Sequence, residues 1–349
     1  MDLLIFVLAL SVLVLVHEWG HFMAARKTGV KVEEFGLGLP PRIFGKKIKG
    51  TIYSLNWLPI GGFCRLYGED GEGKGTDAFN HKKPWQKMLI VLGGVIMNLV
   101  LAVVIFSVVY TIVGIPVETD RVSIVGISPN SPAEKAGLKE NDVILKINDL
   151  AVKKTDALME EIGKNKGKNV QLLISNDQNI KIIEVQIREN PPEGEGAMGV
   201  AISNTEMQKM PWYRVDKGIV AGFKEAYYWG EIIFGGVIKM IGGLLTGNVP
   251  KDVSGPIGMY QATSTINKNQ GILAVIHFFG IVSVNLAVVN VLPFPALDGG
   301  RIIFVLYEMI TKKKANQKFE AIVNNIGMLL LLGLILIITL GDIRRVIGM

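Results

Sequence analysis

The sequence predicts a polytopic α-helical membrane protein with about four transmembrane helices and one inserted α+β domain. Three observations point to this fold class: long uncharged apolar runs, basic residues in the loops beside them, and a central stretch with strand-like alternation. Of the 349 residues, 49% are hydrophobic and only 19% are charged. Because about 20 consecutive apolar residues span a bilayer, the uncharged runs are the candidate membrane-crossing segments.

The N-terminal run, residues 3–24, is predicted to be a retained transmembrane helix and not a cleaved signal peptide. A signal peptide begins with positive charge and ends at a small-residue cleavage site. Here Asp2 precedes the run without any Lys or Arg, and no such site follows. The apolar character also continues past His17 to Met23.

Three further apolar regions follow along the chain. Residues 88–113 contain no charged side chain, and neither do residues 321–341. The region from 271 to 310 is also apolar, but a Pro-rich stretch interrupts it. Each region is long enough to cross a bilayer, which completes the set of about four spans.

Basic residues indicate the orientation of these spans. Twelve Lys and Arg residues lie between residues 26 and 87, and four Lys residues lie between 312 and 318. The positive-inside rule places both loops in the cytoplasm, and it places the termini and residues 114–270 outside. The net charge of +6 is spread along membrane-flanking loops, so we expect the lipid bilayer as a partner and no nucleic acid. Cys64 is the only cysteine, which excludes an intrachain disulfide.

The central stretch predicts a small α+β domain. Alternating runs such as residues 142–148 are typical of strands, and Ser131 before Pro132 starts a short helix. Residues 214–247 are apolar but studded with charges, which favours an amphipathic helix on the outer membrane surface; a fifth span is the alternative. Four segments are expected. Residues 1–113 contain the first two helices with a cytoplasmic-side β-hairpin at 50–69, and residues 114–210 form the α+β domain. Residues 211–270 form the membrane-surface segment, and residues 271–349 contain the last two helices.

The first predicted helix carries the motif HEWGH at residues 17–21. His17 and His21 are four residues apart, so both imidazoles lie on one face of a helix and can bind one metal ion. Glu18 points to a neighbouring direction, from which its carboxylate can reach a metal-bound water. The alternative is a pair of buried, hydrogen-bonded histidines with an unrelated glutamate. Ionisable groups at membrane depth are costly, so three together favour a metal site.

A catalytic zinc ion usually has a third protein ligand, and Asp298 in NVLPFPALDGG (290–300) is the best candidate. Pro293 and Pro295 cannot both lie in an unbroken helix, and such a break is tolerated at membrane depth where it lines a cavity. Other candidates are weaker. His277 would lie about 30 Å away along a continuous helix. Lys27 stands where a metzincin would have a histidine, and three acids lie in the polar loop: Glu33, Glu34 and Glu69.

Together, HEWGH and NVLPFPALDGG resemble the motifs of the site-2 protease family of intramembrane zinc metalloproteases, most closely its bacterial RseP-type members. GGVIMN (93–98) resembles the second core helix of that family, and SPAEKAGLKENDVILKIND (131–149) resembles a PDZ domain segment. RseP-type proteins often carry two PDZ domains, whereas this chain has room for one. The resemblance implies a membrane-reentrant β-hairpin at 50–69 and an extracytoplasmic PDZ-like domain.

The same resemblance implies roles for the site residues. It implies a bound Zn²⁺ ion, Glu18 as the catalytic acid/base, and three metal ligands: His17, His21 and Asp298. It also implies that the substrate backbone is bound by Asn290, Pro293 and Pro295.

The implied activity is regulated intramembrane proteolysis in a bacterial inner membrane. The enzyme would hydrolyse peptide bonds within transmembrane segments of single-span proteins, such as anti-sigma factors or signal-peptide remnants. The PDZ-like domain would bind peptide by strand addition or filter substrates by size. Two other classes are alternatives. A metal transporter also carries intramembrane His and Asp, although transporters usually show internal repeats. An inactive membrane scaffold would use only its PDZ-like domain.

Overall fold

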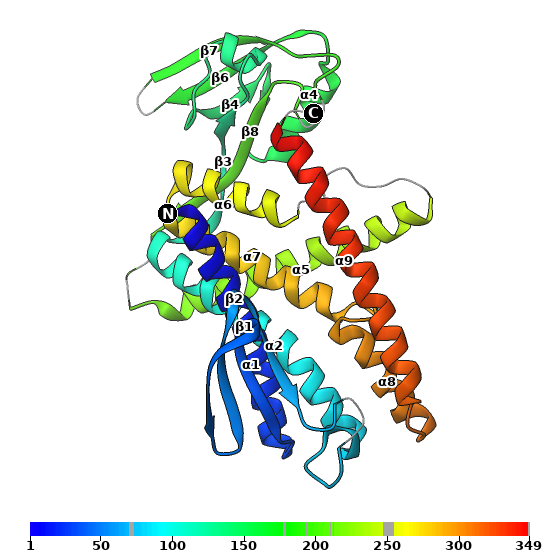
Figure 1. The fold of residues 1–349 in the computed structure, drawn as a ribbon. Coiled ribbons are helices and arrows are strands. Elements are labelled where there is room, and N and C mark those ends of the chain that lie inside the picture. Colours follow the sequence, from blue (N-terminus) through cyan, green and yellow to red (C-terminus); the bar gives the residue numbers. More distant parts are fainter. Residues whose placement is uncertain are drawn as a thin grey trace. The chain divides into compact units, whose positions relative to one another are not determined.

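In the computed structural model, residues 1–111 and 213–349 form one unit, and residues 112–212 form a second (Figure 1). The structure describes residues 1–69, 73–176, 179–192, 195–209, 211, 213–246 and 255–347. The first unit is mainly helical and contains one small sheet, whereas the second is an α+β unit. The predicted α+β insertion is thereby confirmed.

Four helices in the described part of the chain are long and apolar enough to cross a membrane. They are α1 (Asp2–Thr28), α2 (Pro84–Val113), α7 (Ile272–Val291) and α9 (Gln317–Ile347), whose apolar segment is Lys318–Arg344. The four predicted spans are therefore confirmed, and the chain is a multi-pass membrane protein.

Small residues let α1 and α2 approach closely. A methyl group added to Gly93 of α2 would lie 2.6 Å from the carbonyl oxygen of Gly20 on α1. Membrane helices commonly use such small residues where their backbones meet. On α7, the Ser283 hydroxyl donates a hydrogen bond of 2.8 Å to the carbonyl oxygen of Asn98 on α2. The first three spans are thus held together around the middle of α2.

The third apolar region is broken, as its prolines predict. Helix α7 ends at Val291, and α8 (Asp298–Thr311) begins at Asp298. Between them, Ala296 has a φ of 71°, in the left-handed region that non-glycine residues rarely adopt. The last span packs on this connection, because the Asn324 side chain accepts a hydrogen bond of 3.4 Å from the Ala296 N–H. The break therefore places Asp298 at the first turn of a new helix.

The sheet of the first unit consists of β1 (Val32–Ile48) and β2 (Thr51–Leu66). Residues 34–37 pair with 62–65 on one side and with 52–55 on the other, while residues 42–48 pair with 51–56. The order across the sheet is therefore 61–66, 32–39, 51–58 and 42–48. The predicted β-hairpin at 50–69 is not confirmed, because the two halves of this stretch both pair with β1.

Apolar contacts fix this sheet to α1, and an ion pair stabilises the sheet internally. Phe22 of α1 packs against Phe35 of β1 with ring centroids 5.4 Å apart. The buried Glu34 accepts hydrogen bonds from Arg42, at 2.6 Å and 3.0 Å. Burial alone would raise the pKa of Glu34, but hydrogen bonds from Ser54 and Arg42 and the nearby guanidinium charges lower it below its ordinary value. The ion pair thus holds the two halves of β1 together.

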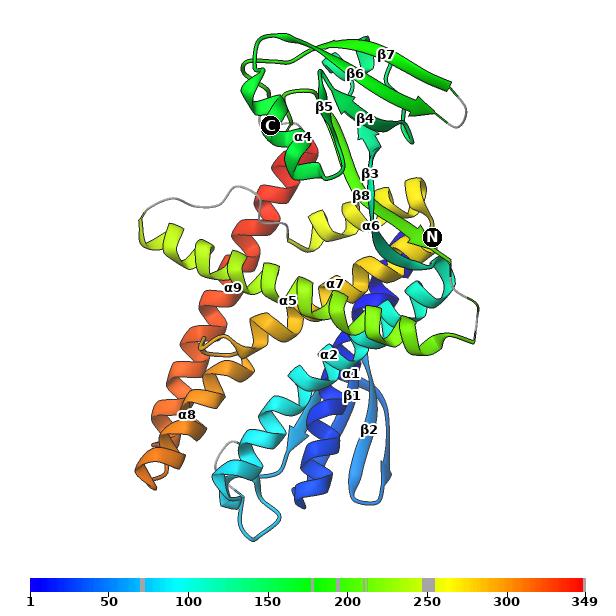
Figure 2. The same cartoon turned by 180° about the vertical axis from the view of Figure 1, so that it is seen from behind.

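The remaining helices of this unit are η1 (Phe79–His81), α5 (Val215–Leu245) and α6 (Pro256–Gln270). Helix α5 lies across α7 (Figure 2) and is not among the four span candidates of the described chain. Helix α6 begins beside α9, where the buried Asp342 carboxylate accepts hydrogen bonds of 2.9 Å from the N–H groups of Gly255 and Gly258. Asp342 therefore caps α6 from a distant helix.

The α+β unit contains a six-stranded sheet in its described residues, with the order β7-β6-β4-β3-β8 and β5 beside β4. Its strands are β3 (Ile115–Ile127), β4 (Val143–Ile147), β5 (Leu150–Ala151), β6 (Asn169–Asn176), β7 (Asn179–Gln186) and β8 (Val200–Gln208). Two helices, α3 (Pro132–Lys135) and α4 (Thr155–Lys164), accompany the sheet. Ser131 accepts a hydrogen bond from the Glu134 N–H, so its predicted role as helix cap is confirmed. A buried core that includes Ile144 and Leu158 holds the unit together.

Candidate metal centre

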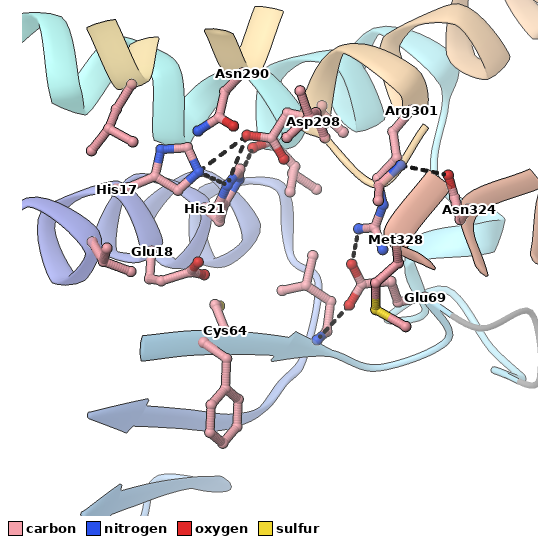
Figure 3. A pocket seen from close by; sticks show the side chains of 18 of the residues that line it. His17, Glu18, His21, Cys64, Glu69, Asn290, Asp298, Arg301, Asn324 and Met328 are labelled. Atoms are coloured by element: carbon pink, nitrogen blue, oxygen red, sulfur yellow. Dashed lines mark hydrogen bonds and ion pairs between the residues drawn. The ribbon is translucent and has the colours of Figure 1, made fainter. Parts of the chain in front are cut away.

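Three side chains from α1 and α8 converge on one point (Figure 3). The Nε2 atoms of His17 and His21 are 3.1 Å apart. One carboxylate oxygen of Asp298, Oδ2, lies 3.1 Å from Nε2 of His17 and 3.4 Å from Nε2 of His21. Two imidazoles and one carboxylate therefore present three donor atoms at the corners of a nearly equilateral triangle.

This triangle fits a tetrahedral zinc ion. Zinc binds imidazole nitrogen and carboxylate oxygen at about 2.0–2.2 Å, which places tetrahedral ligand atoms about 3.3 Å apart. The three separations of 3.1, 3.1 and 3.4 Å bracket this value. Three protein ligands leave the fourth tetrahedral position open, as catalytic zinc sites require.

One stripe of α2 supports both imidazole rings. Ile90, Gly94 and Asn98 are four residues apart and share a helix face. The carbonyl oxygen of Ile90 lies 2.8 Å from Nδ1 of His21, so the Nδ1–H group can donate to it. This hydrogen bond leaves the lone pair of Nε2 facing Asp298. Gly94 leaves space for the rings, since an added methyl group would lie 2.5 Å from Cε1 of His17 and 2.5 Å from Nε2 of His21.

Asn98 lies at the second ring nitrogen of His17, as Ile90 does for His21. Its fully buried side chain lies against His17, with Nδ2 at 3.2 Å from Nδ1. In this orientation Oδ1 of Asn98 is buried and has no hydrogen-bond partner among the described residues. Rotating the amide by 180° exchanges the two atoms, so that Oδ1 accepts from the Nδ1–H of His17. Metal-binding histidines usually have such an acceptor at their second nitrogen.

Glu18 lies beside the convergence point and faces β2 (Figure 3). A methyl group added to Gly62 of β2 would be 3.8 Å from Cγ of Glu18, which is ordinary van der Waals contact. Both Glu18 and the three converging side chains line one cavity of about 530 Å³. The edge of β2, residues 61–66, contributes Phe63, Cys64 and Leu66 to the same cavity.

The residues predicted to bind substrate are not all in this cavity. Asn290 lines it and lies next to Asp298 (Figure 3). Pro293 instead lines a separate apolar hollow between α2, α5 and α7. Pro295 packs against α9, where a methyl group added to Gly327 would lie 2.7 Å from its carbonyl carbon. The two prolines therefore shape the break between α7 and α8, while Asn290 faces the cavity.

Two of the three acids that were weaker candidates for the third ligand, and the histidine, have other ionic partners. Glu34 pairs with Arg42, Glu69 pairs with Arg301, and His277 lies 3.3 Å from Glu225. Sequence reasoning missed Arg301, which also lines the cavity. The sequence spacing indicated that Arg301 lies near Asp298, because it follows Asp298 by three residues and such residues are neighbours on a helix.

Comparisons with known proteins agree with this centre. The chain is 35% identical over 343 residues to a proposed zinc metalloprotease of Clostridium acetobutylicum, covering 98% of this chain and 97% of the relative. It is 32% identical over 363 residues to one of Campylobacter jejuni, covering 98% and 93% of the two chains.

Among solved structures, PDZ domains of SdrC-like proteins from Listeria monocytogenes and Listeria innocua match 25% and 26% of this chain. The matches cover 90% and 100% of those domains, at 20% and 19% identity and a TM-score of 0.22 each. The family model described as "Peptidase family M50" matches residues 5–334, which is nearly the whole chain. The chain therefore belongs to peptidase family M50, and it is a zinc metalloprotease of the membrane.

Proposed function

We propose that this enzyme hydrolyses peptide bonds within the transmembrane segments of single-span membrane proteins. In this proposal His17, His21 and Asp298 bind the zinc ion, and Glu18 is the catalytic acid/base. The observation that carries the proposal is the triangle of donor atoms, with edges of 3.1, 3.1 and 3.4 Å, on helices apolar enough to span a membrane. A metal site on such helices favours a substrate that is itself in the bilayer.

When bound, the zinc ion supplies a water of lowered pKa and polarises the scissile carbonyl group. Glu18 accepts the proton of the attacking water and later delivers it to the nitrogen of the leaving amine. Ile90 and Asn98 orient the two imidazoles during this step, because each lies at the second nitrogen of one ring. Asp298 contributes its carboxylate from the start of α8.

A peptide bond inside a helix is shielded, so the substrate segment has to unwind before it can be cut. The free N–H and C=O groups then need partners in a region without water. Within the part of the chain that the structure describes, residues 62–65 of β2 pair with β1 on one side only, and this edge lines the cavity beside Glu18. We infer that an unwound substrate adds to this edge as a further strand, with the Asn290 amide as a second backbone partner.

The orientation in the membrane is part of the proposal. The basic loops support an orientation with the β1–β2 sheet on the cytoplasmic side and the α+β unit outside. In that orientation α5 lies at the outer membrane surface, where its exposed apolar residues, such as Phe223 and Phe234, contact lipid. The edge strand β8 offers the α+β unit a place for peptide binding by strand addition.

The test uses a fusion protein with a single apolar span of about 20 residues as substrate, in proteoliposomes with purified enzyme. Glu18→Gln is expected to retain zinc and to lose cleavage. Glu231→Gln is the matched control, because Glu231 is exposed on α5 and should leave cleavage unchanged. If Glu18→Gln cuts the fusion protein as fast as the parent enzyme, Glu18 is not the acid/base and the proposal fails.

A further inference from the structure

One ion pair joins the end of β2 to the helix that carries Asp298. The guanidinium group of Arg301, on α8, pairs with Oε1 of Glu69. The other carboxylate oxygen of Glu69, Oε2, accepts a hydrogen bond of 3.3 Å from the backbone N–H of Leu66, the last residue of β2. One carboxylate therefore connects the strand and the helix (Figure 3).

Both ends of this connection lie at the proposed reaction centre. Arg301 is three residues after Asp298, so the two side chains are neighbours on α8 and about 4.5 Å apart along its axis. Leu66 ends the strand edge that lines the cavity, and a methyl group added to Gly62 on the same edge would lie 3.8 Å from Cγ of Glu18. Glu69 and Arg301 also line this cavity. The pair thus connects a metal ligand on one side to the substrate edge on the other.

We propose that the Arg301–Glu69 pair positions the edge of β2 relative to the metal ligands and so selects which substrate peptide bond is cut. The inference rests on the proposed function, in which substrate adds to this edge. A strand rises about 3.3 Å per residue, and a slip of one residue turns every side chain to the other face. Catalytic geometry tolerates only about 0.5 Å. A shift of the edge beyond this tolerance therefore misplaces the principal peptide bond, and a shift of more than half the rise per residue brings a neighbouring bond nearer to the zinc.

A second ion pair on the same helix provides a matched control. Lys87 of α2 and Glu308 of α8 are 2.7 Å apart, and their side chains are 8% and 13% exposed. This pair joins α8 to α2 and does not include the β2 edge. Its loss can destabilise α8 without moving the strand edge along a bound substrate.

The experiment compares Arg301→Gln, Glu69→Gln, the double variant and the control Glu308→Gln. Each variant is incubated in proteoliposomes with the single-span fusion protein, and mass spectrometry of both products gives the cleaved bonds and their proportions. Zinc content is measured on the same samples. These readouts separate selection of the bond from general loss of the fold.

The two single variants are expected to retain zinc, to cut at neighbouring bonds, and to cut the principal bond about 10- to 100-fold more slowly. The double variant should be no worse than the poorer single variant, because both changes remove one interaction. Exchanging the charges, with Arg301→Glu and Glu69→Arg together, restores the ion pair but not the hydrogen bond from the Leu66 N–H, because a guanidinium group has no acceptor. The exchanged variant should therefore recover cleavage at the principal bond only in part. Glu308→Gln should keep the parent's pattern of bonds, even if its rate falls.

Two outcomes overturn the inference. In one, Arg301→Gln and Glu69→Gln cut the same bond in the same proportion as the parent. In the other, their effects multiply in the double variant. Both results leave the proposed function standing, since the parent still cuts. A parent enzyme that leaves every single-span substrate intact refutes the proposed function and this inference together.

Discussion

Gly94 offers a direct test of the metal centre, because a side chain at this position collides with both histidine rings. A methyl group built on Gly94 would lie 2.5 Å from Cε1 of His17 and 2.5 Å from Nε2 of His21. Attractive contacts between such atoms occur at about 3.5–4.0 Å. In Gly94→Ala the rings, or the helix beneath them, have to move by about 1 Å.

This displacement is large for a metal site, where ligand distances are fixed to within about 0.2 Å. Overpacking of this kind typically costs about 1–3 kcal/mol. Since about 1.4 kcal/mol corresponds to a factor of ten in Kd, Gly94→Ala should weaken zinc binding by roughly 5- to 150-fold. The variant is expected to lose cleavage in proportion to its lost zinc.

The assay is zinc occupancy of the detergent-solubilised protein in buffers whose free zinc is set by a competing chelator. Gly333→Ala is the matched control, because Gly333 also lies in a helix apolar enough to span a membrane, and an added methyl group would meet no atom of the described residues within 4 Å. Gly333→Ala gains the same helix propensity as Gly94→Ala, because both replace glycine by alanine within a helix. It should bind zinc as tightly as the parent does. If Gly94→Ala binds zinc as tightly as Gly333→Ala, the rings do not lie over Gly94 and the packing argument is refuted.

Asn98→Leu removes the polar group at Nδ1 of His17 and should shorten zinc retention under chelator by about 10- to 100-fold. Asn98→Asp keeps an acceptor and should lie closer to the parent; equal retention by both variants would contradict this role. Asp342→Ala leaves two N–H groups, at the N-cap and in the first turn of α6, without their acceptor, which should lower the free energy of unfolding by about 1–3 kcal/mol. An unchanged thermal midpoint in detergent would show that the cap is dispensable. The folded-state pKa of Glu34 is lowered, so its carboxylate stabilises the sheet above about pH 4.3, and this is lost as the pH falls through the folded pKa. The stability gap between the parent and Glu34→Gln should therefore shrink in acid, and a gap that stays constant down to about pH 3 would refute the argument.

The sequence was sufficient to expect that His17, His21 and Asp298 meet, because both of its signals are local. Helical spacing places the two imidazoles on one face, and the prolines before Asp298 require a break that starts a new helix. The break is present between Val291 and Asp298.

The sheet and its ion pairs were not predictable in the same way. The first strand, β1, contains Pro40 and Pro41 and shows no simple alternation, and its pairing partners lie on both sides of it. Glu69 and Arg301 are 232 residues apart, and no local pattern connects them. Gly94 was visible in a motif, but its reason is the space that two rings of another helix need.

The distance along the chain between the donor atoms has a consequence for biogenesis. His21 is in the first helix, whereas Asp298 follows it by 277 residues (298 − 21) and comes after the third span. A growing chain therefore exposes two imidazoles to the membrane long before their carboxylate partner is synthesised. We expect chains that end before Asp298 to retain little zinc, as metal analysis of a truncated protein would report. With the proposed ligand set, hydrolytic activity begins only after the third span has been synthesised.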